Sequence, residues 1–510
     1  MKHLKLNKDN IPSYVTHVTE TLERAGFEAF LVGGCVRDLI IGRTPKDWDI
    51  TTNAVPEEII PLFTKTIYEN TFGTVGVVIY TDEAENVTHV TENSPESGKI
   101  DLKTNIIEVT PYRKEGKYSD KRHPDEISFS NSIKDDLMRR DFTINALAYN
   151  VSQESLIDNY NGQEDIKDNV INTVGNAHER FQEDALRLLR AVRFSTELDF
   201  AIGGETLSAI SANADLLKNI SQERIRDELT KIIESPNSAR GVGLLAKLGL
   251  LKYIVPELEE GIGCHQGGAH KYDVFEHLLG ALQHATDKRL STELRLSALF
   301  HDIGKPKTKR TPSNKAKPTF YGHEVVGARM ADKIMNRLKY PKDTTEKVVK
   351  MIRYHMFFSD TELITLSAVR RIIANVGVDN IWDLMTVREC DRVGMDKTEA
   401  PYRLRKYHAM IEEALRDPIS VKQLKVDGNY LMHKLKVKAG PRMGWMLNAL
   451  LEEVLDDPTK NEIEYLSKRV GEFETLSDAD LRALGEKAKE KKEELEDEEV
   501  GKLRKKHGVS

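Results

Sequence analysis

Two carboxylates stand at alternate positions of an apolar stretch, a short distance after a pair of glycines. The stretch LVGGCVRDLIIGRTPKDWDITT, residues 31–52, places Asp47 and Asp49 on either side of Trp48. Because side chains of a β-strand alternate between its faces, we expect Asp47 and Asp49 to share one face and Trp48 the other. Two carboxylates one pleat apart repel each other unless cations neutralise them. Mg²⁺, which also binds nucleotide phosphates, suits such a pair.

The residues before the two aspartates suit an approaching phosphate chain. Gly33 and Gly34 carry no side chain, so a triphosphate could come close to the backbone just before the helical pattern CVRDLII. Arg37 supplies a fixed positive charge nearby. A surface turn with ordinary acids is the alternative interpretation, since two aspartates at this spacing are a weak signal alone. The preceding glycines favour the nucleotide site.

The elements that must position these residues change in type along the chain. Up to about residue 150, helical patterns mix with short β-rich runs such as FLVGG, TVGVVIYT and NIIEVTPYR. From about residue 151 the strand signals fade and helical periodicity prevails. The predicted fold class is therefore multidomain α+β, a mixed-sheet head followed by all-α parts. The predicted domains are 1–150, 151–245, 246–410 and 411–475, with a charged helix at 476–510.

Composition indicates a cytoplasmic protein with several cores. The chain has 510 residues, too many for one core, with 39% hydrophobic and 31% charged residues. Its formal net charge is −7, so any basic surface for nucleic acid must be local. The sequence predicts neither a membrane span nor a signal peptide. Its three cysteines have no CxxC spacing, which argues against disulfides and against a thiolate zinc site.

The stretch at residues 31–52 resembles the signature of the tRNA nucleotidyltransferase and bacterial poly(A) polymerase family, in the DNA polymerase β nucleotidyltransferase superfamily. The resemblance implies that Asp47 and Asp49 hold two Mg²⁺ ions, which act on the primer 3′-hydroxyl and on the incoming triphosphate. The superfamily has a third carboxylate on a neighbouring strand. By position, the candidate is Glu108 in NIIEVTPYR. An ion pair between Glu108 and Arg113 is the structural alternative.

The block DLMRRDFTINALAYN, residues 136–150, is similar to the ribose-recognition motif of the same family. The resemblance implies that Arg139, Arg140 and Asp141 line the nucleotide site, with Asp141 accepting a hydrogen bond from the 2′-hydroxyl. Without the resemblance, two arginines and an aspartate at a helix start are typical of a capping and ion-pair cluster.

The block GNAHERFQEDALRLLRAVRF, residues 175–194, resembles the family's protein template for the incoming base. On a helix, Asp184 and Arg187 would project from one face. Cytosine and adenine each present an acceptor nitrogen beside an amino donor, so one arginine and one aspartate can serve both, whereas U and G present the opposite polarity. Arg190 and Arg193 recur at near-helical spacing and could face phosphates. A solvated ion pair is the alternative interpretation of EDALR.

Features between these blocks distinguish the activities of the family. Bacterial poly(A) polymerases carry a basic segment resembling GRRFxLxHV where this chain has YENTFGTVGVVIY. CC-adding enzymes lack a flexible loop that is present here at residues 112–129, with Lys121 where a glycine is common. Full CCA addition to tRNA from CTP and ATP is therefore favoured, and A-adding or poly(A) synthesis is the alternative.

The segment 420–458 looks like the tail region of the same enzymes. Its first half is basic, and AGPRMG places glycines and a proline at a helix start, where backbone N–H groups could bind an RNA phosphate. Lys436, Lys438 and Arg442 would assist, holding tRNA by shape and charge. A helical hairpin with solvated lysines is the alternative.

A second set of potential ligands lies in the middle of the chain, where LSALFHDIGKPK contains His301 and Asp302. Their order resembles the HD phosphohydrolase superfamily, with further ligands expected at His277, His323, His355 and Asp391. Imidazole with carboxylate suits Mn²⁺, Ni²⁺, Fe²⁺ or Zn²⁺ better than Mg²⁺. The resemblance implies hydrolysis of a phosphoester, for instance a 2′,3′-cyclic phosphate or a 2′-phosphate on a damaged tRNA end. A scaffold role is the alternative.

The sequence therefore predicts a CCA-adding nucleotidyltransferase with tRNA, CTP and ATP as partners and no membrane. Two other classes stay open: an HD phosphohydrolase whose head only senses nucleotides, and an RNA-binding protein with a vestigial head. Complete ligand sets at both sites speak against the last of these.

Overall fold

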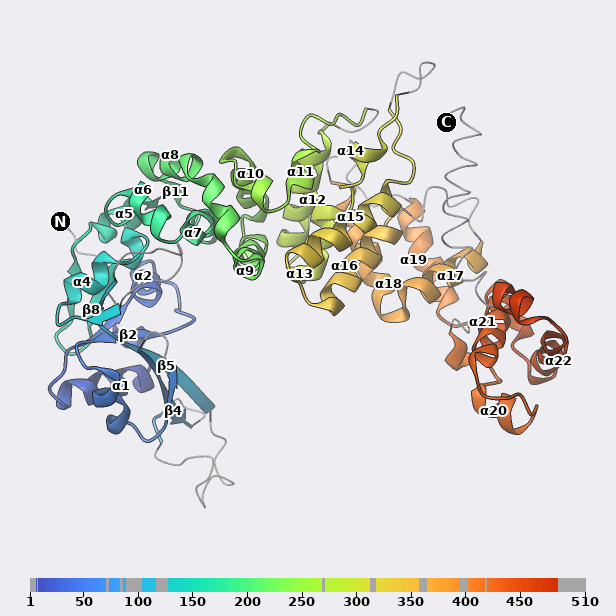
Figure 1. Cartoon of the computed structure of the whole chain (residues 1–510), viewed down its shortest axis with the longest axis horizontal. Helices are drawn as coiled ribbons and strands as arrows, with labels where there is room; N and C mark the ends of the chain where they lie inside the picture. Colours follow the sequence, from blue (N-terminus) through green and yellow to red (C-terminus); the bar gives the residue numbers. More distant parts are fainter. Residues whose placement is uncertain are drawn as a thin grey trace. The chain divides into compact units, whose positions relative to one another are not determined.

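The computed structural model of the chain describes residues 6, 8–69, 73–82, 86–88, 103–115, 127–267, 271–311, 318–356, 365–393, 402–417 and 420–484. The chain divides into two compact units, Met1–Ile232 with Leu244–Tyr253, and Ile233–Gly243 with Ile254–Ser510 (Figure 1). The expectations for Lys121 and most of its loop, and for residues 485–510 of the charged helix, lie outside the described residues.

A seven-stranded mixed sheet forms the centre of the first unit, in the order β3-β4-β5-β2-β1-β8-β9. Only the pair β2 and β5 is parallel among these neighbours. The strands are β1 (Ala29–Val32), β2 (Asp49–Thr52), β3 (Thr66–Glu69), β4 (Thr74–Thr81), β5 (Lys103–Pro111), β8 (Leu147–Asn150) and β9 (Ser155–Asp158). The predicted β-rich runs are thus strands of one sheet, and the β8–β9 hairpin crosses the predicted domain border at residue 150.

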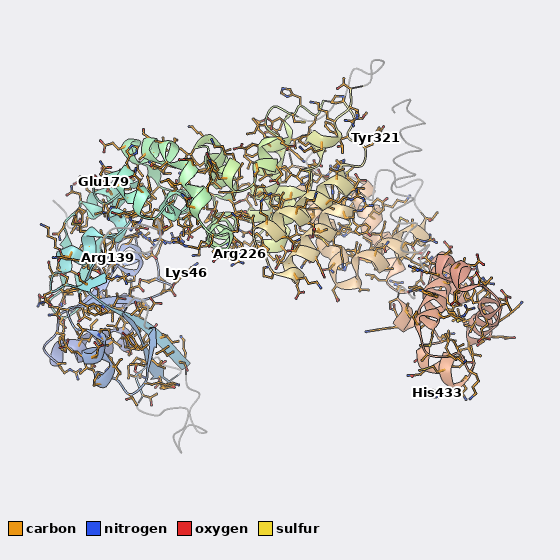
Figure 2. The ribbon with its side chains drawn as sticks, in the orientation of Figure 1. Lys46, Arg139, Glu179, Arg226, Tyr321 and His433 are labelled. Carbon is orange, nitrogen blue, oxygen red and sulfur yellow. The ribbon has the colours of Figure 1, made fainter. Side chains whose placement is uncertain are left out.

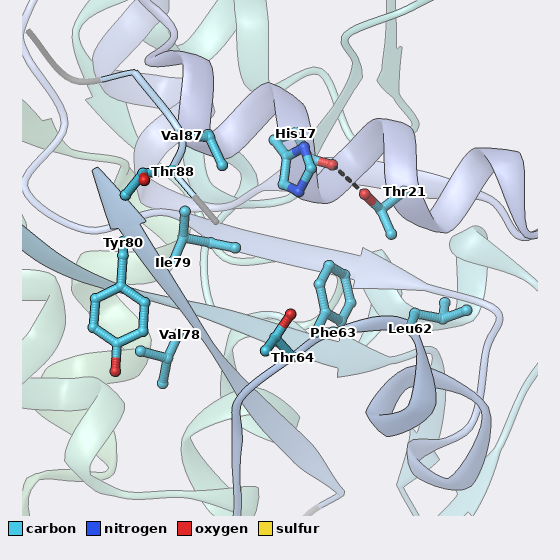
Figure 3. A pocket seen from close by; sticks show the side chains of 10 residues that line it. All are labelled: His17, Thr21, Leu62, Phe63, Thr64, Val78, Ile79, Tyr80, Val87 and Thr88. Carbon is cyan, nitrogen blue, oxygen red and sulfur yellow. Dashed lines mark hydrogen bonds between the residues drawn. The ribbon is translucent and has the colours of Figure 1, made fainter. Parts of the chain in front are cut away.

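Alternation along β5 gives this strand one buried and one exposed face, whereas β4 is buried on both faces from Val77 to Thr81. Val75, Val77, Ile107 and Val109 are fully buried and lie opposite one another in the ladder. Helix α1 (Ser13–Arg24) packs against the sheet through Val15, Val18 and Leu22. Its His17 lines a cavity of about 250 Å³ together with Ile79 of β4 (Figure 3). None of the residues that line this cavity is a predicted site residue.

The helices at residues 175–194 test the prediction that Asp184 and Arg187 lie on one helix. The pattern at residues 175–194 forms two helices, α6 (Ala177–Glu183) and α7 (Leu186–Leu198), and Asp184 between them is extended, with φ −137° and ψ 106°. Its carboxylate accepts a hydrogen bond from the Leu186 N–H at 3.0 Å. An aspartate that bonds its local backbone in this way competes with helix continuation. The expectation that Asp184 and Arg187 share one continuous helix is therefore wrong.

The described part of the second unit is helical apart from two isolated bridges, as its periodicity predicts. Its larger helices are α12 (Val274–Asp287), α13 (Thr292–Phe300), α15 (His323–Arg337), α16 (Lys342–Tyr354), α17 (Leu366–Val376), α18 (Ile381–Cys390), α19 (Tyr402–Ala414), α21 (Pro441–Asp456) and α22 (Ile463–Glu474). Over the described residues, we find no helix with the length and apolar character needed to cross a bilayer.

Candidate active site and candidate metal centre

Asp49 begins strand β2, and Glu108 lies opposite it on the parallel strand β5. Asp47 stands two residues before the strand and is exposed, whereas Trp48 and Ile50 are buried. The predicted alternation of carboxylates and apolar residues is therefore confirmed, although regular strand pairing starts only at Asp49. This pairing brings two carboxylates that are 59 positions apart in sequence onto adjacent strands.

Gly33 leaves room for an arginine beside Asp49. Its φ is +80°, and a Cβ on it would lie 2.9 Å from Nη1 of Arg140 and 3.9 Å from Oδ2 of Asp49. Any other residue would be strained there and would displace the guanidinium. Gly34 follows as the first residue of α2 (Gly34–Ile40). The glycine pair thus sits at the predicted site, and the space at Gly33 admits a cationic side chain beside the carboxylate.

Asp49 lies in a concentration of negative charge. Burial raises the pKa of its carboxyl to about 6, with further upward contributions from Glu108 and Asp47 and an opposing one from Arg140. A divalent cation would relieve this repulsion, so the donor set fits Mg²⁺. Within the described part of the chain, however, the groups of three or more potential ligand atoms within 4.8 Å of one another all lie in the second unit. The head carboxylates are spaced more widely.

Arg139 and Arg140 share a buried partner that sequence reasoning did not single out. Asp136 on α4 (Ile133–Met138) accepts from Arg139 Nη2 at 2.6 Å and from Arg140 Nη2 at 3.0 Å. The carboxyl of Asp141 accepts from Arg190 Nε at 2.6 Å. Burial would raise the pKa of Asp141, but the charges of Arg190 and Arg187 and the hydrogen bonds from Arg190 and Asn145 together outweigh it and hold the pKa at about 2. Asp141 is therefore ionised at neutral pH.

The two candidate base-reading residues each have another charged partner. Arg187 donates from Nη1 to Glu183 Oε2 at 2.5 Å and from Nη2 to the carbonyl of Arg139 at 3.1 Å. Asp184 Oδ2 accepts from Arg224 Nη2 at 2.8 Å. Glu183 could have been suspected from its place beside Asp184. Arg224 could not, because it comes from α9 (Gln222–Glu234), 40 positions away.

Two predicted nucleotide-binding arginines are engaged inside the protein. Arg37 is buried and donates to Asn145 Oδ1 at 2.7 Å and to its neighbour Asp38 at 2.8 Å. Arg193 is buried and donates to Glu228 Oε1 at 2.9 Å. Contact of these two arginines with the nucleotide therefore stays a prediction, and their hydrogen bonds and ion pairs inside the protein do not favour it.

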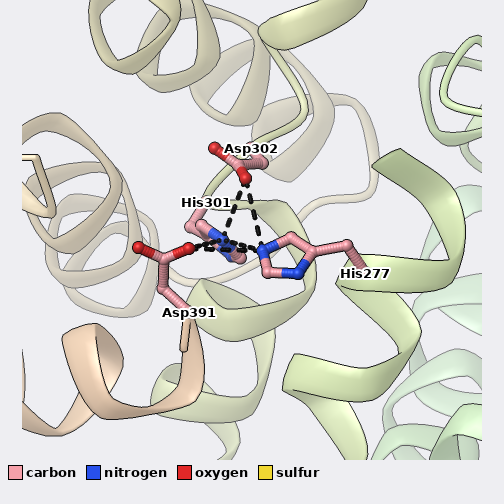
Figure 4. Close-up of side chains that lie close together, drawn as sticks. All are labelled: His277, His301, Asp302 and Asp391. Atoms are coloured by element: carbon pink, nitrogen blue, oxygen red, sulfur yellow. Dashed lines mark hydrogen bonds and ion pairs between the residues drawn. The ribbon is translucent and has the colours of Figure 1, made fainter. Parts of the chain in front are cut away.

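The six histidine and aspartate residues predicted for the second site converge in the second unit. His277 Nε2, His301 Nε2 and Asp391 Oδ1 lie 3.2 Å from one another, and Asp302 Oδ2 lies within 3.4 Å of both imidazoles (Figure 4). On the other side, Asp302 Oδ1 lies 3.1 Å from His323 Nε2 and 3.6 Å from His355 Nε2. Asp302 therefore stands between two ligand groups, each able to hold a cation.

The backbone fixes which nitrogen each imidazole presents to this centre. The Nδ1 atoms of His277, His301, His323 and His355 lie 2.7–3.1 Å from backbone carbonyl oxygens. A carbonyl only accepts, so each Nδ1 carries the proton and each Nε2 turns a lone pair inward. Facing lone pairs at 3.2–3.4 Å repel unless a cation lies between them. This geometry is typical of metal ligation.

Burial favours the neutral form of two imidazoles at this centre, His277 and His355, while Asp302 stays ionised. Burial lowers the pKa of His277, and it lowers that of His355 to about 4. Burial would raise the pKa of Asp302, but Lys305 and His301 hold it well below its usual range. Both carboxylate oxygens of Asp302 are buried and accept no hydrogen bond of acceptable geometry. Lys305 Nζ forms an ion pair with Oδ2 at 2.5 Å. The residues therefore fit a divalent transition metal.

The predicted RNA-binding residues of the tail lie around the start of α21. That helix begins at Pro441, as the AGPRMG pattern predicts, and Lys436 and Lys438 before it are exposed. Arg442 instead donates to the carbonyls of Phe473, Glu474 and Leu476 at 2.7–3.2 Å. These contacts cap the end of α22, so they give Arg442 a structural role and do not favour RNA binding by it. The side chains of both units are drawn in Figure 2, where Arg139 and His433 are labelled.

Three segments match protein-family models. Residues 29–172 match the poly A polymerase head domain, residues 199–262 the probable RNA and SrmB-binding site of polymerase A, and residues 274–396 the HD domain. The first match contains the carboxylates at 47, 49 and 108, and the third contains all six predicted ligands of the second site. Asp184 and Arg187 fall between the first and second matches.

Curated relatives match over two different lengths. The CCA-adding enzyme of Limosilactobacillus reuteri (strain DSM 20016) is 31% identical over 464 residues, which covers 89% of this chain and 95% of that relative. The CCA-adding enzyme of Geobacillus thermodenitrificans (strain NG80-2) is 40% identical over 256 residues, 50% of this chain. The chain spans 57% of that relative and 53% of the one from Geobacillus kaustophilus.

A solved structure agrees with these matches. The crystal structure of the Bacillus stearothermophilus CCA-adding enzyme in complex with CTP is 27% identical, with a TM-score of 0.63, and the match covers 90% of this chain and 97% of that one. This likeness and the nearly full-length Limosilactobacillus reuteri match extend over both units. The chain therefore belongs to the CCA-adding enzyme family.

Proposed function

We propose that the chain adds the CCA sequence to the 3′ end of tRNA, with CTP and ATP as substrates. The observation that carries the proposal is a series of neighbouring charged groups that leads from the candidate metal carboxylates to the candidate base-reading residues. It runs from Asp49 to the neighbouring Arg140, through Asp136 to Arg139, and from there to Arg187. The names of the relatives, and the CTP bound to the Bacillus stearothermophilus enzyme, support the same substrates.

The phosphate end of the proposed site is built from β2, β5 and α4. Asp47, Asp49 and Glu108 are the residues that would hold Mg²⁺, since they lie on or just before adjacent strands. Mg²⁺ bound there would stabilise the charge that develops on the phosphate oxygens during transfer. Arg140, beside Asp49, would bind the triphosphate. Asp141, which is ionised at neutral pH, would accept a hydrogen bond from the ribose.

The base end of the proposed site is the pair Asp184 and Arg187. An arginine donor and an aspartate acceptor complement the Watson–Crick edges of cytosine and adenine and oppose those of uracil and guanine. Each now pairs with a neighbour, Arg224 or Glu183, so the side chains are held in place before a base arrives. A uracil or guanine would turn donor against donor and acceptor against acceptor here, so its own edge groups would be unpaired, at a cost of about 1–3 kcal/mol each.

A tRNA that ends at its discriminator base tests the proposed activity. We expect CTP alone to give products ending in CC, ATP alone to give no addition, and both together to give CCA, as resolved by sequencing the 3′ ends. Addition of a single A, or of a long A tail, would instead favour the A-adding or poly(A) alternative. Failure to extend the tRNA with any nucleotide would contradict the proposal.

Hydrolysis of a phosphoester at the second site is a second candidate function. It is favoured by one observation, the two groups of ligands that share Asp302, each with imidazole nitrogens turned inward. His277, His301, Asp302 and Asp391 would hold one cation, and Asp302, His323 and His355 another. Such a cation would supply Lewis-acid stabilisation of a phosphoester oxygen. Lys305 pairs with Asp302 and Arg388 with Asp391, and both would bind a phosphate beside the cation.

Replacing His277 by alanine tests the second site. We expect His277→Ala to weaken Mn²⁺ or Ni²⁺ binding by at least about 100-fold in calorimetry, because it removes a ligand. Hydrolysis of a 2′,3′-cyclic phosphate should fall with it, while extension of tRNA stays unchanged. His284→Ala is the matched control, since His284 lies on the same helix α12 outside the cluster. Equal metal affinity in the two variants would contradict the assignment.

A further inference from the structure

One face of the sheet carries exposed apolar side chains beside the candidate catalytic carboxylates. Asp49 lies opposite Glu108, Glu108 opposite Gly76, and Gly76 opposite Ile67. Directly opposed residues of a ladder share a face, so these four form one row across β2, β5, β4 and β3. Figure 1 shows β2, β5 and β4 side by side in this order. Ile106, two positions before Glu108 on β5, lies on the same face.

The apolar part of this face is a shallow ledge, formed by the exposed Ile67 and Ile106 on either side of Gly76, with the buried Val78 next to them on β4. Ile106 is 57% exposed and Ile67 47%, whereas Val75, Val77, Ile107 and Val109 on the opposite face of β4 and β5 are fully buried. A Cβ on Gly76 would lie 3.4 Å from Ile106 Cγ2 and 3.6 Å from Ile67 Cβ, so the two isoleucines flank the glycine. Large apolar side chains that are exposed to solvent next to a polar site are typical of a binding surface.

The position of the ledge suits one particular part of a substrate. Neighbouring strands lie about 4.8 Å apart, which puts Gly76 about 10 Å and Ile67 about 14 Å from Asp49. An RNA primer whose 3′-hydroxyl reaches Asp49 and Glu108 must place its last nucleoside within that distance. The incoming nucleotide is held elsewhere in the proposed site, by Arg140 and the Asp184–Arg187 pair, and so leaves the ledge free for the primer.

We propose that this ledge binds the base of the primer's 3′-terminal nucleotide, an inference that rests on the proposed CCA addition. The terminal base changes after each step of that reaction, so its subsite must accept different bases. Stacking on an apolar surface is tolerant in this way because every base has a flat face, whereas a hydrogen-bonding subsite would select one base. Gly76 at the centre lets a ring approach the backbone closely.

A cation stands at the far end of the ledge, where the primer backbone would continue. Tyr80 lies on the same side of β4 as Val78, opposite to Ile79 (Figure 3). Lys65 donates to the Tyr80 hydroxyl at 2.7 Å. Its positive charge is therefore fixed two ladder positions beyond Val78, at a place that suits a backbone phosphate of the primer.

The test replaces the exposed isoleucines by threonine, which keeps the β-branched shape that strands favour. We expect Ile67→Thr with Ile106→Thr to raise the KM for a tRNA ending at the discriminator base about tenfold, with the KM for CTP unchanged. Tyr68→Thr is the matched control, because Tyr68 is 38% exposed on the same strand but on the opposite face. Thermal unfolding and light scattering check that fold and oligomeric state are unaffected.

A primer with an abasic 3′-terminal nucleotide gives the sharper readout. With that primer the wild type and the double variant should have the same KM, since the contact is already lost. An unchanged tRNA KM in the double variant, an equal rise in the KM for CTP, or a change in oligomeric state would overturn the ledge proposal alone. A wild-type chain that extends no tRNA would instead refute the proposed function and this inference together.

Discussion

Replacing Asp49 by asparagine is expected to lower the rate of nucleotide addition by at least about 1,000-fold, equivalent to about 4 kcal/mol of barrier. The amide keeps the shape of the side chain but removes the charge that would hold Mg²⁺. Asp49 begins β2 opposite Glu108 and has its pKa raised to about 6 by burial and neighbouring carboxylates, so loss of its charge also relieves repulsion. The folded state should therefore be at least as stable as in the wild type.

Single-turnover extension of tRNA and thermal unfolding measure the two effects separately. Glu57→Gln on the exposed side of α3 (Pro56–Ile59) is the control for a lost carboxylate elsewhere in the same unit, and it should keep full activity. Activity within about tenfold of the wild type for Asp49→Asn, at saturating Mg²⁺, would remove Asp49 from the catalytic site. If Asp49→Asn fails to fold, Asp49→Glu replaces it in the test. This variant keeps the charge, and we expect it to add nucleotides at a rate between those of the wild type and Asp49→Asn.

Local patterns in the sequence predicted the elements that carry the head site. Alternation around Trp48 placed two carboxylates on one face, and Gly33 occupies a conformation with positive φ that only glycine adopts without strain. The same local patterns could not predict which residues of neighbouring strands pair with each other. That Glu108 lies opposite Asp49, and Gly76 opposite Glu108, depends on pairing between segments far apart in the chain.

The ion-pair partners of the charged site residues were also not predictable from the sequence. Asp136, which pairs with Arg139 and Arg140, lies in the ribose-recognition block, but no pattern there marked it as their partner, and Arg224 beside Asp184 lies outside every motif. The break between α6 and α7 was also missed, because the apolar periodicity continues through Asp184 while its side chain bonds the backbone locally. The second site was predicted almost completely, since each of its ligands falls within a recognisable local motif.

Removing Arg187 is expected to relax the choice of nucleotide. In Arg187→Ala the ratio of UTP or GTP incorporation to that of CTP or ATP should rise about tenfold to 100-fold, because the donor that opposes the wrong bases is gone. Incorporation of CTP and ATP should fall as well, since their acceptor nitrogens lose a partner. Binding of Mg²⁺ should change little, because Arg187 contacts Glu183 and the carbonyl of Arg139 and none of the candidate metal ligands.

Arg180 provides the matched comparison for this prediction. It donates to the other oxygen of Glu183, at 2.6 Å, so Arg180→Ala disturbs the same carboxylate without removing the base-reading donor. Competition between all four nucleotides, read by sequencing the products, should show relaxed selection for Arg187→Ala and wild-type selection for Arg180→Ala. Equal loss for all four nucleotides in Arg187→Ala would mean that Arg187 only supports the break between α6 and α7. Equal relaxation in both variants would assign selection to Glu183, whose position both arginines then fix.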